Sequence, residues 1–180
     1  MVRLIAKSAL AGHLPRQIGG IAITEVHPGP VTSVAPFAGR GAEVSAALSP
    51  LGLRWPEPGE ALASDAARIL WVGRSMALVM GAAVPDGLAA HAALTDQTGA
   101  SAIVDLSGEG LDEVLARLVP VDLRLSACPV GATRRTLIGH MQGSVTRTGP
   151  DRIEIAVMRS MGETMVHDLE RAIGTWSARP

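Results

Sequence analysis

The sequence predicts an α+β fold in which small antiparallel or mixed sheets are packed by helices. In the second half of the chain, segments follow one another in the order strand, helix, two strands, helix, as in a ferredoxin-like unit. Hydrophobic residues make up 47% of the chain but aromatic residues only 2%, so the core must be built from aliphatic side chains and Met. The length of 180 residues fits one ordinary domain, or two small lobes that share a core.

Gly and Pro punctuate the first 35 residues, which predicts an N-terminal arm over residues 1–35. Within this arm, residues 21–26 have the composition of a short strand. The remainder, residues 36–180, is predicted to form a single α+β domain, built either as one unit or as two small lobes. The apolar content of the arm indicates that it packs on the main body or on a partner.

The first half of the domain contains four interpretable segments. Apolar residues at helical spacing predict a helix over 41–49. Two prolines, which cannot take part in a regular ladder, predict a loop over 53–59. The runs 67–72 and 76–80 flank a Gly-Arg-Ser turn and predict a β-hairpin. A further strand is predicted over 101–106.

The second half begins with an apolar stripe that predicts a helix over 109–119, ended by the following proline. Strands are predicted over 134–141 and 153–158. Ser160 and Glu163 have the spacing of a capping box, in which each side chain accepts a hydrogen bond from a backbone amide of the first helical turn. The sequence therefore predicts a final helix that begins at this point.

Charge and composition exclude several classes of protein. The net charge is −1 and the isoelectric point about 6.5, whereas a nucleic-acid-binding domain would carry a basic stripe. No run of eighteen apolar residues occurs, so no membrane-spanning helix is expected. A single Cys excludes an internal disulfide and favours a cytoplasmic location. Only 18% of residues are charged and the mean hydropathy is +0.28, which fits an apolar surface for a partner and a compact Ala-rich core equally well.

The inventory of chemically active groups is poor. The five His residues lack metal-ligand spacing and have no Cys pair beside them, so no metal site is expected. The turn 107–110 lies between a strand and a helix, but Glu109 places a negative charge where a phosphate would bind. No nucleophile elbow is present, and Cys128 has the character of a structural thiol. We therefore expect no catalytic, cofactor-binding or metal-binding residue in this chain, and expect its scattered Arg residues to pair across an interface.

Several long segments carry a resemblance to a known family. These include SVAPFAGR (33–40), TDQTGASAIVDLSG (95–108), TRRTLIGHM (133–141) and TRTGPDRIEIAVMRSM (146–161). They resemble the gamma subunit of heterotetrameric sarcosine oxidase, and the resemblance runs from about residue 31 to the C-terminus. It implies a fold related to the first domain of the glycine-cleavage aminomethyltransferase and of the tRNA-modifying GTPase.

The resemblance also implies a role. The complex oxidatively demethylates sarcosine to glycine, with tetrahydrofolate as the one-carbon acceptor, and the large alpha subunit is the implied main partner. FAD, FMN, NAD, zinc and tetrahydrofolate are implied for the other subunits, and no cofactor for this chain. Aminomethyltransferases have an Asp pair where this chain has residues 142–147, which contain no Asp. Folate chemistry is therefore not expected in this chain.

Four residues are predicted to contact the large subunit, since Trp and Arg are enriched at interface hot spots: Phe37, Arg40, Trp55 and Pro56. For Phe37 and Trp55, packing in the local core is an equally good interpretation. Two other functions stay open. One is the corresponding subunit of an N-methylglutamate dehydrogenase-type complex. The other is a stand-alone folate-binding module, which predicts a pocket lined by Arg and aromatic side chains.

Overall fold

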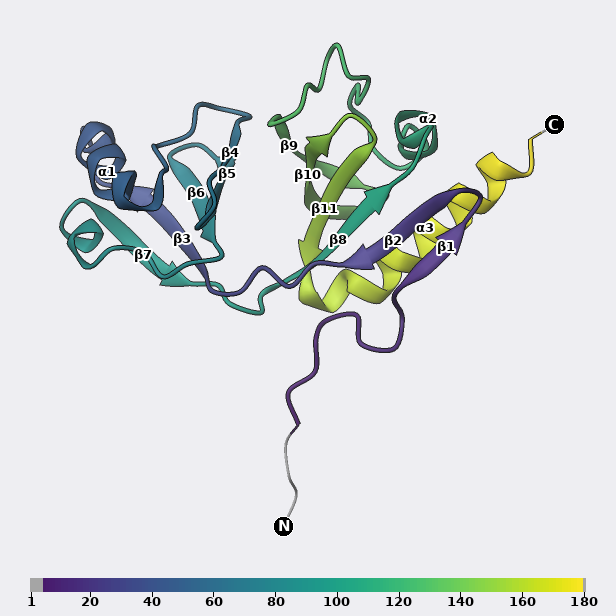
Figure 1. Ribbon diagram of the computed structural model, residues 1–180, viewed down its shortest axis with the longest axis horizontal. Helices are drawn as coiled ribbons and strands as arrows, with labels where there is room; N and C mark the ends of the chain where they lie inside the picture. Colours follow the sequence, from purple (N-terminus) through teal and green to yellow (C-terminus); the bar gives the residue numbers. More distant parts are fainter. Residues whose placement is uncertain (1–4, 180) are drawn as a thin grey trace.

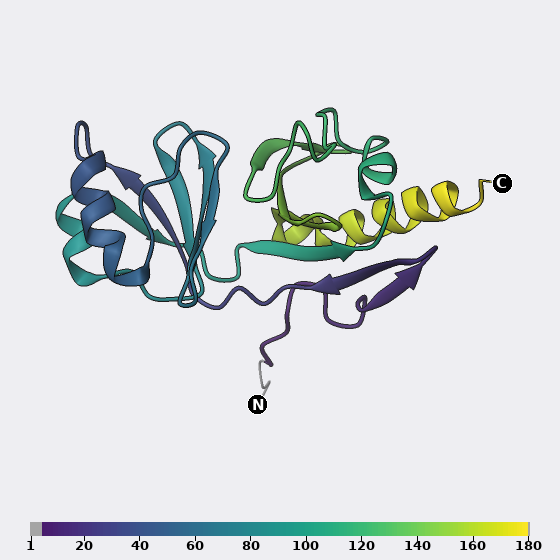
Figure 2. The same cartoon turned by 45° about the horizontal axis from the view of Figure 1, so that its top comes forward.

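A computed structural model describes residues 5–179 of the chain. Two sheets stand beside each other, and each carries its helices on the face turned away from the other sheet (Figures 1 and 2). One sheet has six strands and the other five, and neighbouring strands in both are antiparallel. The predicted α+β class, with small antiparallel sheets packed by helices, is confirmed.

The six-stranded sheet is built from both ends of the chain. In spatial order its strands are β1 (Arg16–Ile18), β2 (Ile21–Glu25), β8 (Ser101–Ser107), β11 (Arg152–Met158), β10 (Met141–Gly149) and β9 (Thr133–Ile138). The short helix α2 (Leu111–Leu115) and the long helix α3 (Gly162–Ser177) share a core with one face of it. Alternate strand residues such as Val104, Val145 and Ile155 point into this core and are fully buried.

The five-stranded sheet comes from the segment between β2 and β8. In spatial order its strands are β4 (Ala61–Ala63), β5 (Arg68–Gly73), β6 (Met76–Met80), β3 (Val31–Pro36) and β7 (Ala92–Asp96). One face of this sheet shares a core with the helix α1 (Gly41–Leu48) and with the short 3₁₀ helices η1 (Ser49–Leu51) and η2 (Asp86–Ala90). The predicted helix over 41–49 and the hairpin of 67–72 and 76–80 are confirmed.

The helix α3 forms because its apolar residues recur at helical spacing. Met165, Leu169 and Ile173 are fully buried against the six-stranded sheet. The predicted capping box is wrong, since Ser160 lies in the 3₁₀ helix η3 (Arg159–Met161) and no side chain caps α3. Among the described residues, no helix combines the length and apolar character needed to cross a bilayer.

Two predictions in the second half are wrong in detail. The strand expected over 134–141 is broken at Gly139, where φ is +58°, and the chain turns back to form the long strand β10. Position 143 of β10 is occupied by Gly, and a Cβ there would be 2.5 Å from the Ala156 carbonyl oxygen. The helix expected over 109–119 is limited to Leu111–Leu115, and turns follow it.

The predicted N-terminal arm takes part in both sheets. Its residues 16–18 and 21–25 form the outer hairpin of the six-stranded sheet, and β3 pairs with β6 and β7 in the other sheet. Residues 1–4 of the arm lie outside the described residues. The arm packs on the main body through strand pairing over residues 16–35, and Leu10 is also buried in the core of the six-stranded sheet.

The uncovered faces of the two sheets meet in a small joint. Val31, Leu70 and Met80 of the five-stranded sheet are buried against Ile103 of the six-stranded sheet. Beside this apolar contact, Arg68 of β5 donates a hydrogen bond to Glu154 of β11. The joint holds the sheets together on one side, and the space between them opens into a cleft on the other.

Candidate functional site

The cleft between the two sheets is a hollow of about 460 Å³. Cross-strand pairing explains how its walls arise. On one wall, Arg135, Ser144 and Ala156 are direct partners on β9, β10 and β11, so they share one face of the sheet. On the other wall, Thr95 and Ser33 are partners on β7 and β3, and Ser33 also faces Leu78 of β6. The described lining residues are Ser33, Val72, Met76, Leu78, Met80, Thr95, Gln97, Ala100, Ser101, Arg135, Gln142, Ser144, Ala156, Val157 and Met158.

Arg135 is the one charged side chain among the described residues that line the cleft. Its neighbour Arg134 donates to the carbonyl oxygens of Gly59, Thr133 and Ala127. The side chain of Arg135 is exposed and, within residues 5–179, forms no hydrogen bond or ion pair. The guanidinium group therefore remains available for an acceptor that comes from outside the chain.

Other properties of the cleft also fit a surface that receives a second molecule. The hydroxyl and amide side chains on its walls form no hydrogen bond with any described residue. Met76 and Met158 are 43% and 63% exposed, and flexible Met side chains are common where a surface adapts to a partner. No Phe or Trp is among the described lining residues, so the cleft lacks the aromatic side chains that the folate-module hypothesis predicts.

Sequence reasoning missed the carboxylates beside the joint. Asp105 of β8 and Glu154 of β11 are direct cross-strand partners, 7% and 9% exposed. Arg152 donates a hydrogen bond to Asp105 at 2.9 Å, and this hydrogen bond raises the pKa of the Arg152 guanidinium. Arg68 pairs with Glu154. The alternation of polar and apolar residues in 152–155 could have revealed one polar face, but not its partner strand. Both carboxylates are already paired, so they do not form a free acid–base site.

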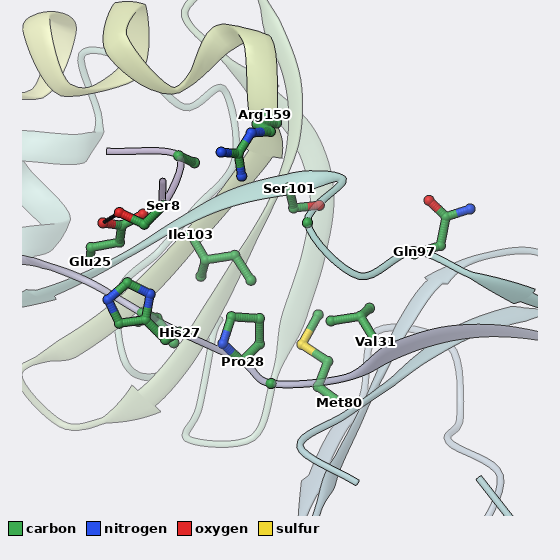
Figure 3. Close-up of a pocket in the computed structure, with 14 residues that line it drawn as sticks. Ser8, Glu25, His27, Pro28, Val31, Met80, Gln97, Ser101, Ile103 and Arg159 are labelled. Carbon is green, nitrogen blue, oxygen red and sulfur yellow. Dashed lines mark hydrogen bonds between the residues drawn. The ribbon is translucent and has the colours of Figure 1, made fainter. Parts of the chain in front are cut away.

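A smaller hollow of about 200 Å³ lies on the other side of the joint (Figure 3). Its two charged side chains hold the N-terminal segment. Glu25 accepts hydrogen bonds from the Ser8 hydroxyl at 2.7 Å and the Leu10 amide at 2.9 Å. Arg159 donates to the Lys7 carbonyl oxygen at 2.6 Å. These groups serve to fix the chain, so this hollow is a weaker candidate than the cleft.

Two of the predicted interface residues lie in one exposed turn. Phe37 is 49% exposed, and its carbonyl oxygen accepts a hydrogen bond from the Arg40 amide at 2.9 Å. Arg40 pairs with Glu43 at 2.8 Å. A hydrogen bond from its own backbone amide and the contact with Arg40 hold the pKa of Glu43 below its usual value. The contact of this turn with another subunit stays a prediction.

The other two predicted interface residues belong to the core of the five-stranded sheet. Trp55 is half-buried against that core, and its amide donates to the Ser45 hydroxyl of α1 at 2.8 Å. Pro56 is buried. This placement agrees with the core-packing interpretation of Trp55, and a further contact with a partner stays a prediction.

The residues singled out for other chemistry do not converge. Within residues 5–179, no group of three or more His, Cys, Asp or Glu residues could hold a metal ion. Cys128 is fully buried and reduced. The turn at 107–110 is a close-packed connection, because a Cβ on Gly108 would be 2.9 Å from the Gly20 carbonyl oxygen. Residues 142–147 lie in β10, and the Thr146 hydroxyl among them forms a hydrogen bond of 2.8 Å with the Thr133 hydroxyl of β9.

Comparison with known families decides the relationship. The family model described as "Sarcosine oxidase, gamma subunit family" matches residues 44–173. The chain belongs to this family. The resemblance inferred from the segments between residue 33 and residue 161 is therefore confirmed. No curated protein matches the sequence.

Solved structures agree with the membership in the sarcosine oxidase gamma subunit family. One chain of the heterotetrameric sarcosine oxidase from Corynebacterium sp. U-96, in complex with pyrrole 2-carboxylate, superposes with a TM-score of 0.82 at 21% identity, covering 97% of this chain and 98% of that chain. At this identity the likeness shows the fold. Two further solved structures are much less similar. E. coli aspartokinase III has a TM-score of 0.42 at 14% identity, covering 88% of this chain and 34% of that chain. The regulatory subunit of aspartate kinase from Thermus thermophilus has a TM-score of 0.40 at 13% identity, covering 87% of this chain and 99% of that chain.

Proposed function

We propose that this chain is the gamma subunit of a heterotetrameric sarcosine oxidase and serves its assembly by contacting the large alpha subunit. The complex would demethylate sarcosine oxidatively to glycine, with tetrahydrofolate as the one-carbon acceptor. The observation that carries the proposal is the family match over residues 44–173, which spans both sheets. The likeness to a chain of the Corynebacterium complex over nearly the whole length supports it.

The chemistry of the chain supports an assembly role. Its buried carboxylates are engaged in ion pairs with Arg68 and Arg152, and no described cluster could hold a metal. In this proposal FAD, FMN, NAD, zinc and tetrahydrofolate are bound by the other subunits. The exposed turn of Phe37 and Arg40 would contact the alpha subunit, and Trp55 and Pro56 would provide further contacts with it.

Co-expression tests the proposal directly. The chain would be tagged, produced together with the subunits encoded beside it, and recovered by its tag. The expected result is a yellow assembly that produces peroxide from sarcosine. Recovery of this chain alone, under conditions in which the other subunits assemble with one another, would overturn the proposal. An assembly that oxidises N-methylglutamate and not sarcosine would assign the chain to the other type of complex.

The predicted contacts can be tested in the same preparation. Arg40→Ala and Phe37→Ala change exposed side chains and should weaken assembly while changing the free energy of unfolding of the isolated chain by less than about 1 kcal/mol. Thr175→Ala, at an exposed position on α3, is the matched control and should leave both unchanged. Full assembly of Arg40→Ala and Phe37→Ala would remove this turn from the interface.

A further inference from the structure

We propose that the cleft between the two sheets receives a segment of a partner subunit, which presents a carboxylate side chain to Arg135 and apolar side chains to Met76 and Met158. This inference rests on the proposed function, since it names the surface and the chemistry of one contact within the assembly. It concerns a different part of the molecule from the turn of Phe37 and Arg40.

The charge of the cleft defines the polar part of the segment. Arg135 is exposed, is the one charged side chain among the described lining residues, and has no acceptor within residues 5–179. Its pairing with Ser144, and that of Ser144 with Ala156, fixes it on the face that turns toward the other sheet. A guanidinium group favours carboxylate because it can donate two parallel hydrogen bonds. The complementary partner is therefore a segment that contains Asp or Glu.

The remaining lining defines the apolar part. Met158 is 63% exposed and Met76 43%, although both belong to strands whose neighbouring residues are buried. Exposed apolar side chains at the two walls of one cleft lose contact with water when a second apolar surface enters between them. The side-chain amides of Gln97 and Gln142 form no hydrogen bond with a described residue, so they can hydrogen-bond to the backbone of an inserted segment. These features favour a polypeptide over a small anion, which would leave the Met side chains uncovered.

Charge reversal provides the first test. Arg135→Glu would place a like charge opposite the partner carboxylate, so assembly with the co-expressed subunits should weaken at least about tenfold. Arg117→Glu is the matched control, because Arg117 is also exposed and forms no ion pair with a described residue. Arg135→Gln should give an intermediate loss. Thermal melting of the isolated chain should be the same for all three variants, because none removes a contact within the chain.

Site-specific crosslinking identifies the occupant. The natural Cys128 is fully buried, so a single cysteine introduced as Gln142→Cys can be labelled selectively with a photoreactive maleimide. In the purified complex, illumination should join it to a peptide of a partner subunit that contains Asp or Glu next to apolar residues. Arg117→Cys serves as the control position and should not yield that peptide.

Failure of the cleft proposal can be distinguished from failure of the proposed function. If wild-type chain assembles, but Arg135→Glu assembles equally well and the Gln142→Cys label reacts only within its own chain, the cleft proposal is overturned while the subunit role stands. If wild-type chain does not assemble, the proposed function itself has failed. A loss with Arg135→Glu together with a crosslinked acidic peptide would support both.

Discussion

Removing the guanidinium group of Arg68 should destabilise the protein by leaving Glu154 without its partner between the two sheets. Arg68 belongs to β5 of the five-stranded sheet and donates to Glu154 of β11 in the six-stranded sheet. In Arg68→Ala, Glu154, which is 9% exposed in the folded chain, would lose its partner. Glu154 already lies directly opposite Asp105, and like charges on adjacent strands repel. Without Arg68, no positive charge beside Glu154 offsets this repulsion.

The size of the effect follows from the burial of the pair. Loss of one partner costs about 3–5 kcal/mol for a buried ion pair, whereas an exposed pair contributes about 0–1 kcal/mol. The side chains of Arg68 and Glu154 are 23% and 11% exposed, which is closer to the buried limit. We therefore expect a decrease of about 2–3 kcal/mol in the free energy of unfolding. For a chain of this length, that corresponds to a decrease of about 5–10 °C in Tm.

Urea denaturation followed by Trp fluorescence would measure the change. Two controls separate the charge effect from loss of packing. Arg54→Ala breaks a more exposed pair, with side chains 52% and 26% exposed, and should cost less than about 1 kcal/mol. The double variant Arg68→Met with Glu154→Leu removes both charges and should regain most of the loss. Equal losses for Arg68→Ala and Arg54→Ala, or no recovery in the double variant, would refute the reasoning.

Three further predictions concern single positions. Ile155→Ala opens a cavity in the fully buried core of the six-stranded sheet and should lower the free energy of unfolding by about 3 kcal/mol in urea titrations. Gly110→Ala places a Cβ 2.4 Å from Cζ2 of Trp176 at a φ of +76°; it should cost at least about 1–2 kcal/mol and shift the Trp emission. Hydrogen bonds from Arg124 lower the pKa of Asp122 to about 2, so NMR titration of Arg124→Ala should show it returning toward about 4. Because the folded pKa is depressed, the stabilisation from this pair is present above about pH 4 and is lost as the pH falls toward 2.

Local patterns were sufficient where an element depends on neighbours in the sequence. The hairpin of β5 and β6 follows from two β-rich runs around a short turn. The buried face of α3 follows from the spacing of Met165, Leu169 and Ile173. The capping box failed because Ser160 entered a 3₁₀ turn packed beside β8, which the spacing alone does not reveal.

The sequence by itself determined the α+β class and the small number of chemically active groups, because these depend on composition and on the local order of residues. It also indicated the family, through the resemblance of long segments to known gamma subunits. Only the tertiary structure decided that Asp105 lies opposite Glu154, that Arg68 of one sheet pairs with Glu154 of the other, and that Arg135 lines a cleft. These relations join residues that are distant in the chain, such as Arg68 and Glu154, 86 positions apart. Strand register sets which face each side chain occupies, and a shift of one residue would reverse it.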